Sequence, residues 1–123
     1  MGKLVGNYRV QVKTTAPDTN TVTLYGYEVP KGKTAILSFM SIIDYTNNEN
    51  ELMVGILDAG GNEHILEMEL GTVYRPWHVL AIEGSVILLS GEKPFGRVLS
   101  PSTSDVIYFT AHGGLYEEAA PLA

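Results

Sequence analysis

The segment TAILSFMSIIDY, residues 34–45, is the longest apolar strand that this sequence of 123 residues predicts. In an extended chain, successive side chains point to opposite faces. Apolar residues then fall on both faces, with Ala35, Leu37, Phe39 and Ile43 on one side and Ile36, Met40 and Ile42 on the other. Such a segment is typical of a central strand that is covered by the core on one face and by a loop or a partner on the other. We therefore expect the fold to be built around residues 34–45.

Shorter strand patterns precede and follow this segment. Tyr8, Val10 and Val12 alternate with polar residues, which indicates a half-buried strand. Further strands are predicted over residues 21–29, 52–57, 63–70, 79–82, 86–89, 97–99 and 106–110. Turn residues separate these segments, most clearly in the hairpin loop DAGGN at residues 58–62. A helix is expected only as a short turn near residues 116–120.

This regular succession of short strands predicts an all-β protein. We expect a single-domain, jelly-roll-like β-sandwich of about eight strands over residues 1–123. The composition of residues 1–7 and 117–123 favours loosely ordered N-terminal and C-terminal arms, which could become ordered against a neighbouring subunit.

Composition and charge exclude several classes of function. Eight basic and fourteen acidic residues give a formal net charge of −6, and the basic residues are scattered. Nucleic acid and anionic membranes are therefore not expected as partners, because both are bound by clustered positive charge. The chain has no cysteine, which excludes disulfides, thiolate catalysis and zinc–sulfur sites. It also lacks the apolar runs of a secretion signal or a membrane helix, so we expect a soluble protein.

The histidines are the first candidates for chemistry, and they lie far apart in the sequence at His64, His78 and His112. The segment around His64 invites comparison with the cupins, whose metal site needs a second histidine two positions later. That position is Leu66 here. A cupin-like enzyme would need all three histidines and Glu67 to converge around one metal ion. We therefore predict no metal site and no cofactor.

Other catalytic patterns are equally weak. Glu67 and Glu69 share one face of a predicted strand, but this spacing is common in any strand and favours a solvated acidic surface over a pair of hydrolytic carboxylates. The sequence contains no Gly-x-Ser-x-Gly nucleophile motif. We assign no catalytic residue and do not expect an enzyme.

The segment YRPWH, residues 74–78, contains the only tryptophan of the chain. Tyrosine, arginine and tryptophan dominate the energetics of protein interfaces, and an exposed tryptophan can also stack on a sugar ring. Alternatively, Trp77 plugs one end of the sandwich. The candidate partner-binding residues are Tyr74, Arg75, Trp77, His78, Arg97, Glu117 and Glu118.

A family resemblance narrows these possibilities. The segment YEVPKGKT at residues 27–34, the apolar strand after it, the 58–62 hairpin and residues 80–89 with their central glycine resemble small jelly-roll proteins of tailed bacteriophages. The resemblance covers residues 22–111 and points to the decoration, or cement, proteins of the outer capsid.

The resemblance implies a virion structural protein that binds the lattice of the major capsid protein and stabilises the head. It also implies a homotrimer that is made in the host cytoplasm and is located on the outer capsid surface. The alternative is a carbohydrate- or receptor-binding module of a phage tail or head appendage, which would use Trp77 and Tyr74 as its aromatic surface.

Overall fold

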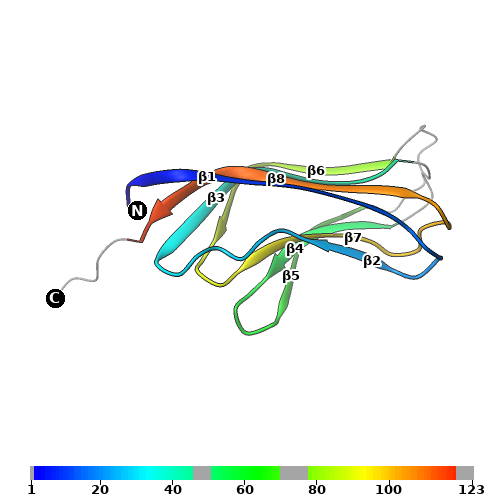
Figure 1. Cartoon of the computed structure of the whole chain (residues 1–123), viewed down its shortest axis with the longest axis horizontal. Coiled ribbons are helices and arrows are strands. Elements are labelled where there is room, and N and C mark those ends of the chain that lie inside the picture. The colour runs from blue at the N-terminus through cyan, green and yellow to red at the C-terminus, as the bar shows by residue number, and fades with distance from the viewer. Residues whose placement is uncertain (1, 46–50, 70–77, 119–123) are drawn as a thin grey trace.

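The computed structural model describes residues 2–45, 51–69 and 78–118. In these ranges, eight antiparallel strands form two four-stranded sheets packed face to face (Figure 1). Sheet A consists, in spatial order, of β1 (Leu4–Thr15), β8 (Val106–Glu117), β3 (Lys33–Asp44) and β6 (His78–Leu88). Sheet B consists of β2 (Val22–Tyr25), β7 (Lys93–Val98), β4 (Leu52–Leu57) and β5 (Glu63–Glu69).

The chain passes from one sheet to the other at almost every connection. Only β4 and β5, joined by the predicted 58–62 hairpin loop, are consecutive strands of the same sheet. This arrangement is a jelly-roll-like β-sandwich, so the predicted fold class is confirmed. Within the described residues there is no helix of the length and apolarity needed to cross a membrane.

The hydrophobic core lies between the two sheets. Strands of both sheets contribute alternate residues to it, and its largest fully buried aliphatic and aromatic side chains include Tyr8, Leu37, Ile42, Leu52 and Phe109. Each such side chain contributes roughly 1.5–3 kcal/mol through its removal from water. The core therefore holds the two sheets together and leaves the outer face of each sheet available for contacts.

The central strand β3 lies between β8 and β6, as predicted, but its two faces differ from the expected ones. A register shift between Leu37 and Phe39 leaves Ser38 as an additional residue of β3 relative to β8, while β6 places Gly84 and Ser85 opposite it. Because such a bulge reverses the alternation, Leu37 faces the core on one side of it and Met40 on the other. Phe39 and Ile43, expected on the same face as Ala35, consequently lie on the outer face.

The segments predicted as two strands over 79–82 and 86–89 form one continuous strand, β6. Gly84 bends this strand without ending it. Its φ angle of 130° lies in a region that residues with a side chain rarely adopt. The prediction that a strand ends at Gly84 was therefore wrong, because the residues before and after the bend both pair with β3.

The prediction of a loosely ordered N-terminal arm over residues 1–7 was wrong for Leu4–Asn7. These residues form the start of β1 and pair with the end of β8. Tyr116 and Glu117 belong to β8, so the short helix expected from residue 116 does not begin there. The backbone N–H of Glu117 donates to the carbonyl of Lys3 at 2.9 Å, which holds the two chain ends together. Residues 119–123 of the expected C-terminal arm lie outside the described residues.

Candidate functional site

The outer face of sheet B carries a row of apolar residues across all four strands. Tyr25 of β2 is paired with Phe95 of β7, which is paired with Gly55 of β4, and Gly55 in turn with Ile65 of β5. Gly96, the neighbour of Phe95, packs against the core, so Phe95 points the opposite way, to the outer face. The row therefore forms a continuous strip across the sheet, buried at Phe95 and Gly55 and exposed at its two ends, Tyr25 and Ile65.

A second row runs parallel to the first. In this row, Thr23 of β2, Arg97 of β7, Met53 of β4 and Met68 of β5 are register partners. Together, the two rows define the surface that we call the apolar face of sheet B. Its members are Thr23, Tyr25, Met53, Gly55, Ile65, Met68, Phe95 and Arg97.

Phe95 is fully buried even though it lies on an outer face. The guanidinium of Arg97 lies over its ring at 4.8 Å from the centroid, and the ring of Tyr25 packs beside it at 6.1 Å. Gly55 leaves room for this arrangement, since a Cβ atom there would lie 2.8 Å from Cζ of Phe95. The centre of the apolar face is therefore rigidly packed before any partner binds.

Arg97 was predicted as a partner-binding residue, and it does lie on this face, but its charge is already engaged. Its Nε donates to Thr23 Oγ1 at 2.8 Å, and its two terminal nitrogens donate to the two carboxylate oxygens of Glu63. These bonds raise the pKa of Arg97 and lower the pKa of Glu63, the hydrogen bond between them being the main cause in each case. Arg97 thus orders the apolar face and offers little free charge to a partner.

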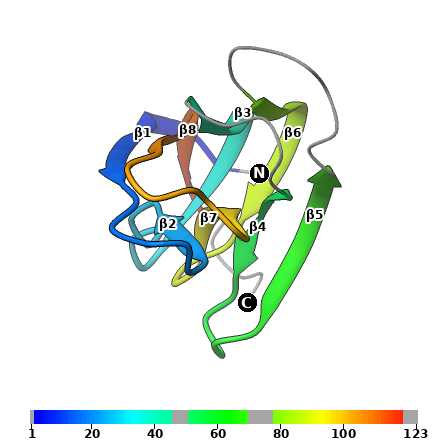
Figure 2. The ribbon, with the colours of Figure 1, turned by 90° about the vertical axis from the view of Figure 1, so that its right-hand side faces the viewer.

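The strand β5 is exposed along almost its whole length, from Glu63 to Met68. Figure 2 shows it at the edge of sheet B, in a hairpin with β4 that extends beyond the other strands. The apolar side chains of Ile65, Leu66 and Met68 are 45%, 40% and 52% exposed. An apolar edge of this kind is a typical protein contact surface, because soluble monomers seldom leave such groups clustered in water.

The turn that joins β4 to β5 is organised by Asp58. Its carboxylate accepts hydrogen bonds from the backbone N–H groups of Gly60 and Asn62, each at 2.9 Å, and lies 2.8 Å from Nε2 of His64. The contact with His64 is the largest cause that lowers the pKa of Asp58 from 3.8 to about 2. His64 therefore has a structural partner in the hairpin.

The cupin-like arrangement is not present among the described residues. His64 belongs to β5 of sheet B, whereas His112 belongs to β8 of sheet A and stacks on Phe39 with ring centroids 5.2 Å apart. Across the described ranges, no three His, Asp or Glu side chains are grouped closely enough to hold a metal ion. The side chain of His78 lies outside the described part of the structure, although the backbone of His78 begins β6.

The remaining candidates from the sequence are dispersed. Tyr74, Arg75 and Trp77 lie outside the described residues. Glu117 ends β8, and the carboxylate of Glu118 accepts a hydrogen bond from Ser90 Oγ at 2.6 Å. Glu117 belongs to sheet A and Glu118 follows it, so of the described candidates only Arg97 belongs to the apolar face of sheet B.

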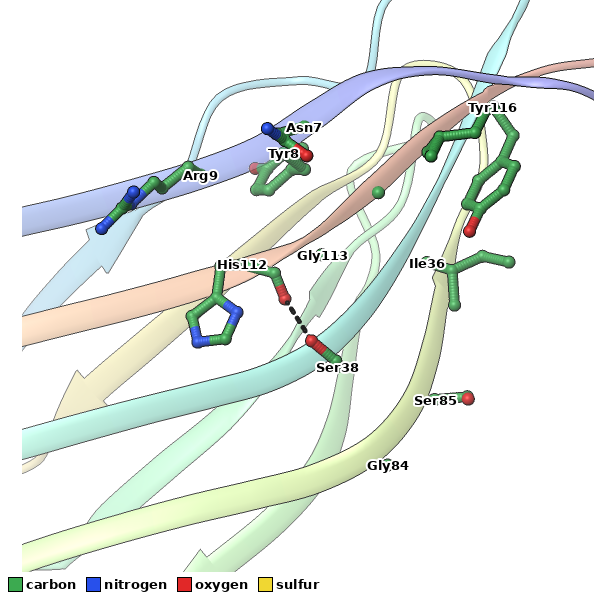
Figure 3. A pocket seen from close by; sticks show the side chains of 12 residues that line it. Asn7, Tyr8, Arg9, Ile36, Ser38, Gly84, Ser85, His112, Gly113 and Tyr116 are labelled. Carbon is green, nitrogen blue, oxygen red and sulfur yellow. Dashed lines mark hydrogen bonds between the residues drawn. The ribbon is translucent and has the colours of Figure 1, made fainter.

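The outer face of sheet A contains a hollow of about 670 Å³ (Figure 3). It is lined by residues of all four strands of this sheet: Leu4, Asn7, Tyr8, Arg9, Ile36, Ser38, Gly84, Ser85, His112, Gly113, Gly114 and Tyr116. The sequence did not lead us to predict this hollow. The adjacent glycines 113 and 114 are the clearest signal of it in the sequence.

No protein-family model matches this sequence, and no curated protein sequence matches it either. Solved structures are similar in fold. The core of Drosophila NLP, whose structure concerns pentamer formation and histone binding, is 15% identical with a TM-score of 0.48, over 92% of this chain and 100% of that one.

Two further structures illustrate how varied the matching proteins are. TmCBM61, solved in complex with β-1,4-galactotriose, is 14% identical with a TM-score of 0.43, over 94% of this chain and 88% of that one. A pentameric capsid protein from metagenomic phage sequences is 15% identical with a TM-score of 0.42, over 91% of this chain and 63% of that one. The roles of these proteins differ, and the jelly-roll-like β-sandwich of this chain is established by its own strand order.

Proposed function

We propose that this chain is a virion structural protein that decorates a capsid and binds the major capsid protein through the apolar face of sheet B. The observation that carries this proposal is the exposed apolar end of that face, where its two rows finish at Ile65 and Met68 of β5. The protein has no catalytic role in this proposal and acts by contact alone.

The chemistry of this face is suited to burial against another protein. Its centre is aromatic and aliphatic, and Arg97, the cation over Phe95, is already paired with Glu63, whereas Lys93 lies over Tyr25 on the edge strand β2. A partner therefore does not have to strip water from a free charge at the centre of the contact. His64, Glu67 and Glu69 lie on the other side of β5, because they are register partners of the core-facing Ile56, Val54 and Leu52, so one side of this strand is apolar and the other is polar.

The proposal includes the homotrimer and the location on the outer capsid surface that the bacteriophage resemblance implies. Light scattering of the free protein and a count of copies on decorated heads measure the number of subunits. The sugar-stacking alternative was predicted on Tyr74 and Trp77, which lie outside the described residues, so nothing described here supports that cluster as a site.

Co-sedimentation with undecorated heads of the parent phage tests the proposal. The double variant Ile65→Asp/Met68→Asp should lose binding, because it places two charges in the buried part of the contact. Ile87→Asp is the matched control, since Ile87 is also exposed, at 53%, but lies on the outer face of sheet A. Equal binding by both variants, or no binding by the unmodified protein, would contradict the proposal.

A further inference from the structure

The hollow on sheet A lies where two adjacent glycines, Gly113 and Gly114, interrupt the side chains of β8. Asn7, Gly114 and Ile36 are register partners on three neighbouring strands, and the middle position carries no side chain. A Cβ atom on Gly114 would lie 2.9 Å from Cδ1 of Leu4 and 3.0 Å from Cε2 of Tyr116. The side chains of Leu4 and Tyr116 therefore occupy the space over Gly114 and form one wall of the hollow.

The bend of the sheet extends the hollow towards β6. A Cβ atom on Gly113 would lie 2.0 Å from the carbonyl oxygen of Ile36, so β8 and β3 approach one another there as only glycine permits. On the other side of β3, the Ser38 bulge is opposite Gly84 and Ser85. The depression is therefore a permanent feature of the fold, and its volume lies within the range typical of sites for small molecules.

The lining combines an apolar floor with polar groups that have no partner. Ile36, Leu4 and the ring of Tyr116 supply apolar area. The side chains of Asn7, Arg9 and Ser85 make no hydrogen bond or ion pair within the part of the chain that the structure describes. An aromatic ring beside several hydrogen-bonding groups matches a saccharide, which presents C–H groups on its ring faces and hydroxyls around its edge.

Arg9 adds a positive charge to this set. It is the only fully charged residue of the lining, in a chain whose net charge is −6, and its register partner is His112. Glu83 belongs to the same row of the sheet but lies beyond Phe39, and it does not line the hollow. An anionic group is therefore favoured at the Arg9 and His112 end, where two nitrogen-bearing side chains lie together.

We propose that the hollow binds an acidic saccharide, a sugar ring that carries a carboxylate, as in sialic and uronic acids. The carboxylate lies against Arg9 and His112, the ring lies against Ile36 and Tyr116, and the hydroxyls bond to Asn7 and Ser85 (Figure 3). This inference goes beyond the proposed decoration function and is independent of it. A protein attached to a capsid through sheet B would present this hollow on its opposite, outward sheet.

Titration of the whole, isotopically labelled protein with N-acetylneuraminic acid and with glucuronic acid tests this proposal, with galactose and acetate as the comparison ligands. Chemical-shift changes should centre on the amides of Ser85, Gly113 and Gly114. We expect a dissociation constant on the order of 1 mM for at least one acidic sugar, because one sugar ring makes few contacts. Galactose and acetate should each bind at least tenfold more weakly, since each supplies only part of the recognised chemistry.

Two variants of β1 make the test specific. Arg9→Gln should weaken binding of the acidic sugar by about tenfold, because it removes the cation that faces the carboxylate. Lys13→Gln removes the same charge from the same face of the same strand, outside the hollow, and should change binding less than about twofold.

Three results would overturn the proposal: no shift changes at about 50 mM sugar, equal loss of binding in the two variants, or equal binding of acetate and the acidic sugars. Each of these results leaves the capsid-binding function of sheet B untouched. Conversely, failure of capsid co-sedimentation does not affect the sugar titration.

Discussion

Arg97 of β7 and Glu63 of β5 are joined by two parallel hydrogen bonds that pass over the intervening strand β4. The same guanidinium also donates to Thr23 of β2, so one side chain connects both edge strands of sheet B. Gly55, which has no side chain, leaves the space that the ring of Phe95 occupies beneath the Arg97 guanidinium. The flatness and order of the apolar face therefore depend on a few interdependent residues.

Replacement of Arg97 should loosen this face. Arg97→Met keeps much of the aliphatic cover over Phe95 but removes the bonds to Glu63 and Thr23, so the melting temperature should fall. Lys93→Met is the control, because the ammonium of Lys93 lies over the exposed ring of Tyr25 and has no ion pair in the described residues. Differential scanning calorimetry of both variants checks this prediction, which fails if they melt at the same temperature.

Gly55→Ala should destabilise the fold by about 1–3 kcal/mol, because the added methyl group has no space. It would lie 2.4 Å from the carbonyl oxygen of His64 and 2.8 Å from Cζ of Phe95. Gly6→Ala, where nothing lies within 4 Å of the new Cβ atom, should stay close to the unmodified protein. Urea unfolding of both variants measures the difference, and equal midpoints would count against the tight packing described here.

Tyr8→Phe should cost about 1 kcal/mol of stability. The hydroxyl of Tyr8 donates to the carbonyl oxygen of Tyr27 at 2.6 Å, and the Tyr8 side chain is fully buried, which raises its pKa. The stacked rings, with centroids 4.1 Å apart, remain in the variant, so only the hydrogen bond is lost. Chemical denaturation measures the loss. Tyr116→Phe is the comparison, since the hydroxyl of Tyr116 has no hydrogen-bond partner in the described part of the chain, and a similar loss there would refute the explanation.

The β4–β5 turn should lose stability in acid. The pKa of Asp58 is lowered in the folded state, from 3.8 to about 2, so its hydrogen bonds stabilise the turn above pH 4 and are lost as the pH falls towards 2. Asp58→Asn should flatten the dependence of the melting temperature on pH within this window.

The His64→Ala variant tests the cause of this shift. Since the hydrogen bond from His64 is the largest cause, His64→Ala should move the pKa of Asp58 upward, towards 3.8. Titration of the Asp58 carboxyl carbon by NMR measures this change. An unchanged midpoint would show that the backbone donors of the turn are sufficient.

The sequence alone determined the class of fold and its central element. Alternating strand patterns and closely spaced turn residues are local properties, and they identified the β-sandwich and the 58–62 hairpin. The apolar segment at 34–45 was sufficient to place β3 between two other strands, because edge strands are seldom apolar along their whole length.

Only the tertiary structure decided which residues share a face. The additional residue at Ser38 reverses the alternation of β3, and another register shift in the β4–β5 pairing places Ile65 and Met68 on one face. Tyr25, Phe95, Gly55 and Ile65 come together because strands distant in sequence are neighbours in sheet B. The two-residue periodicity of a strand predicts that neighbouring side chains point to opposite faces of the sheet. Bulges and the pairing of distant strands decide which face each side chain takes, and neither leaves a local pattern in the sequence.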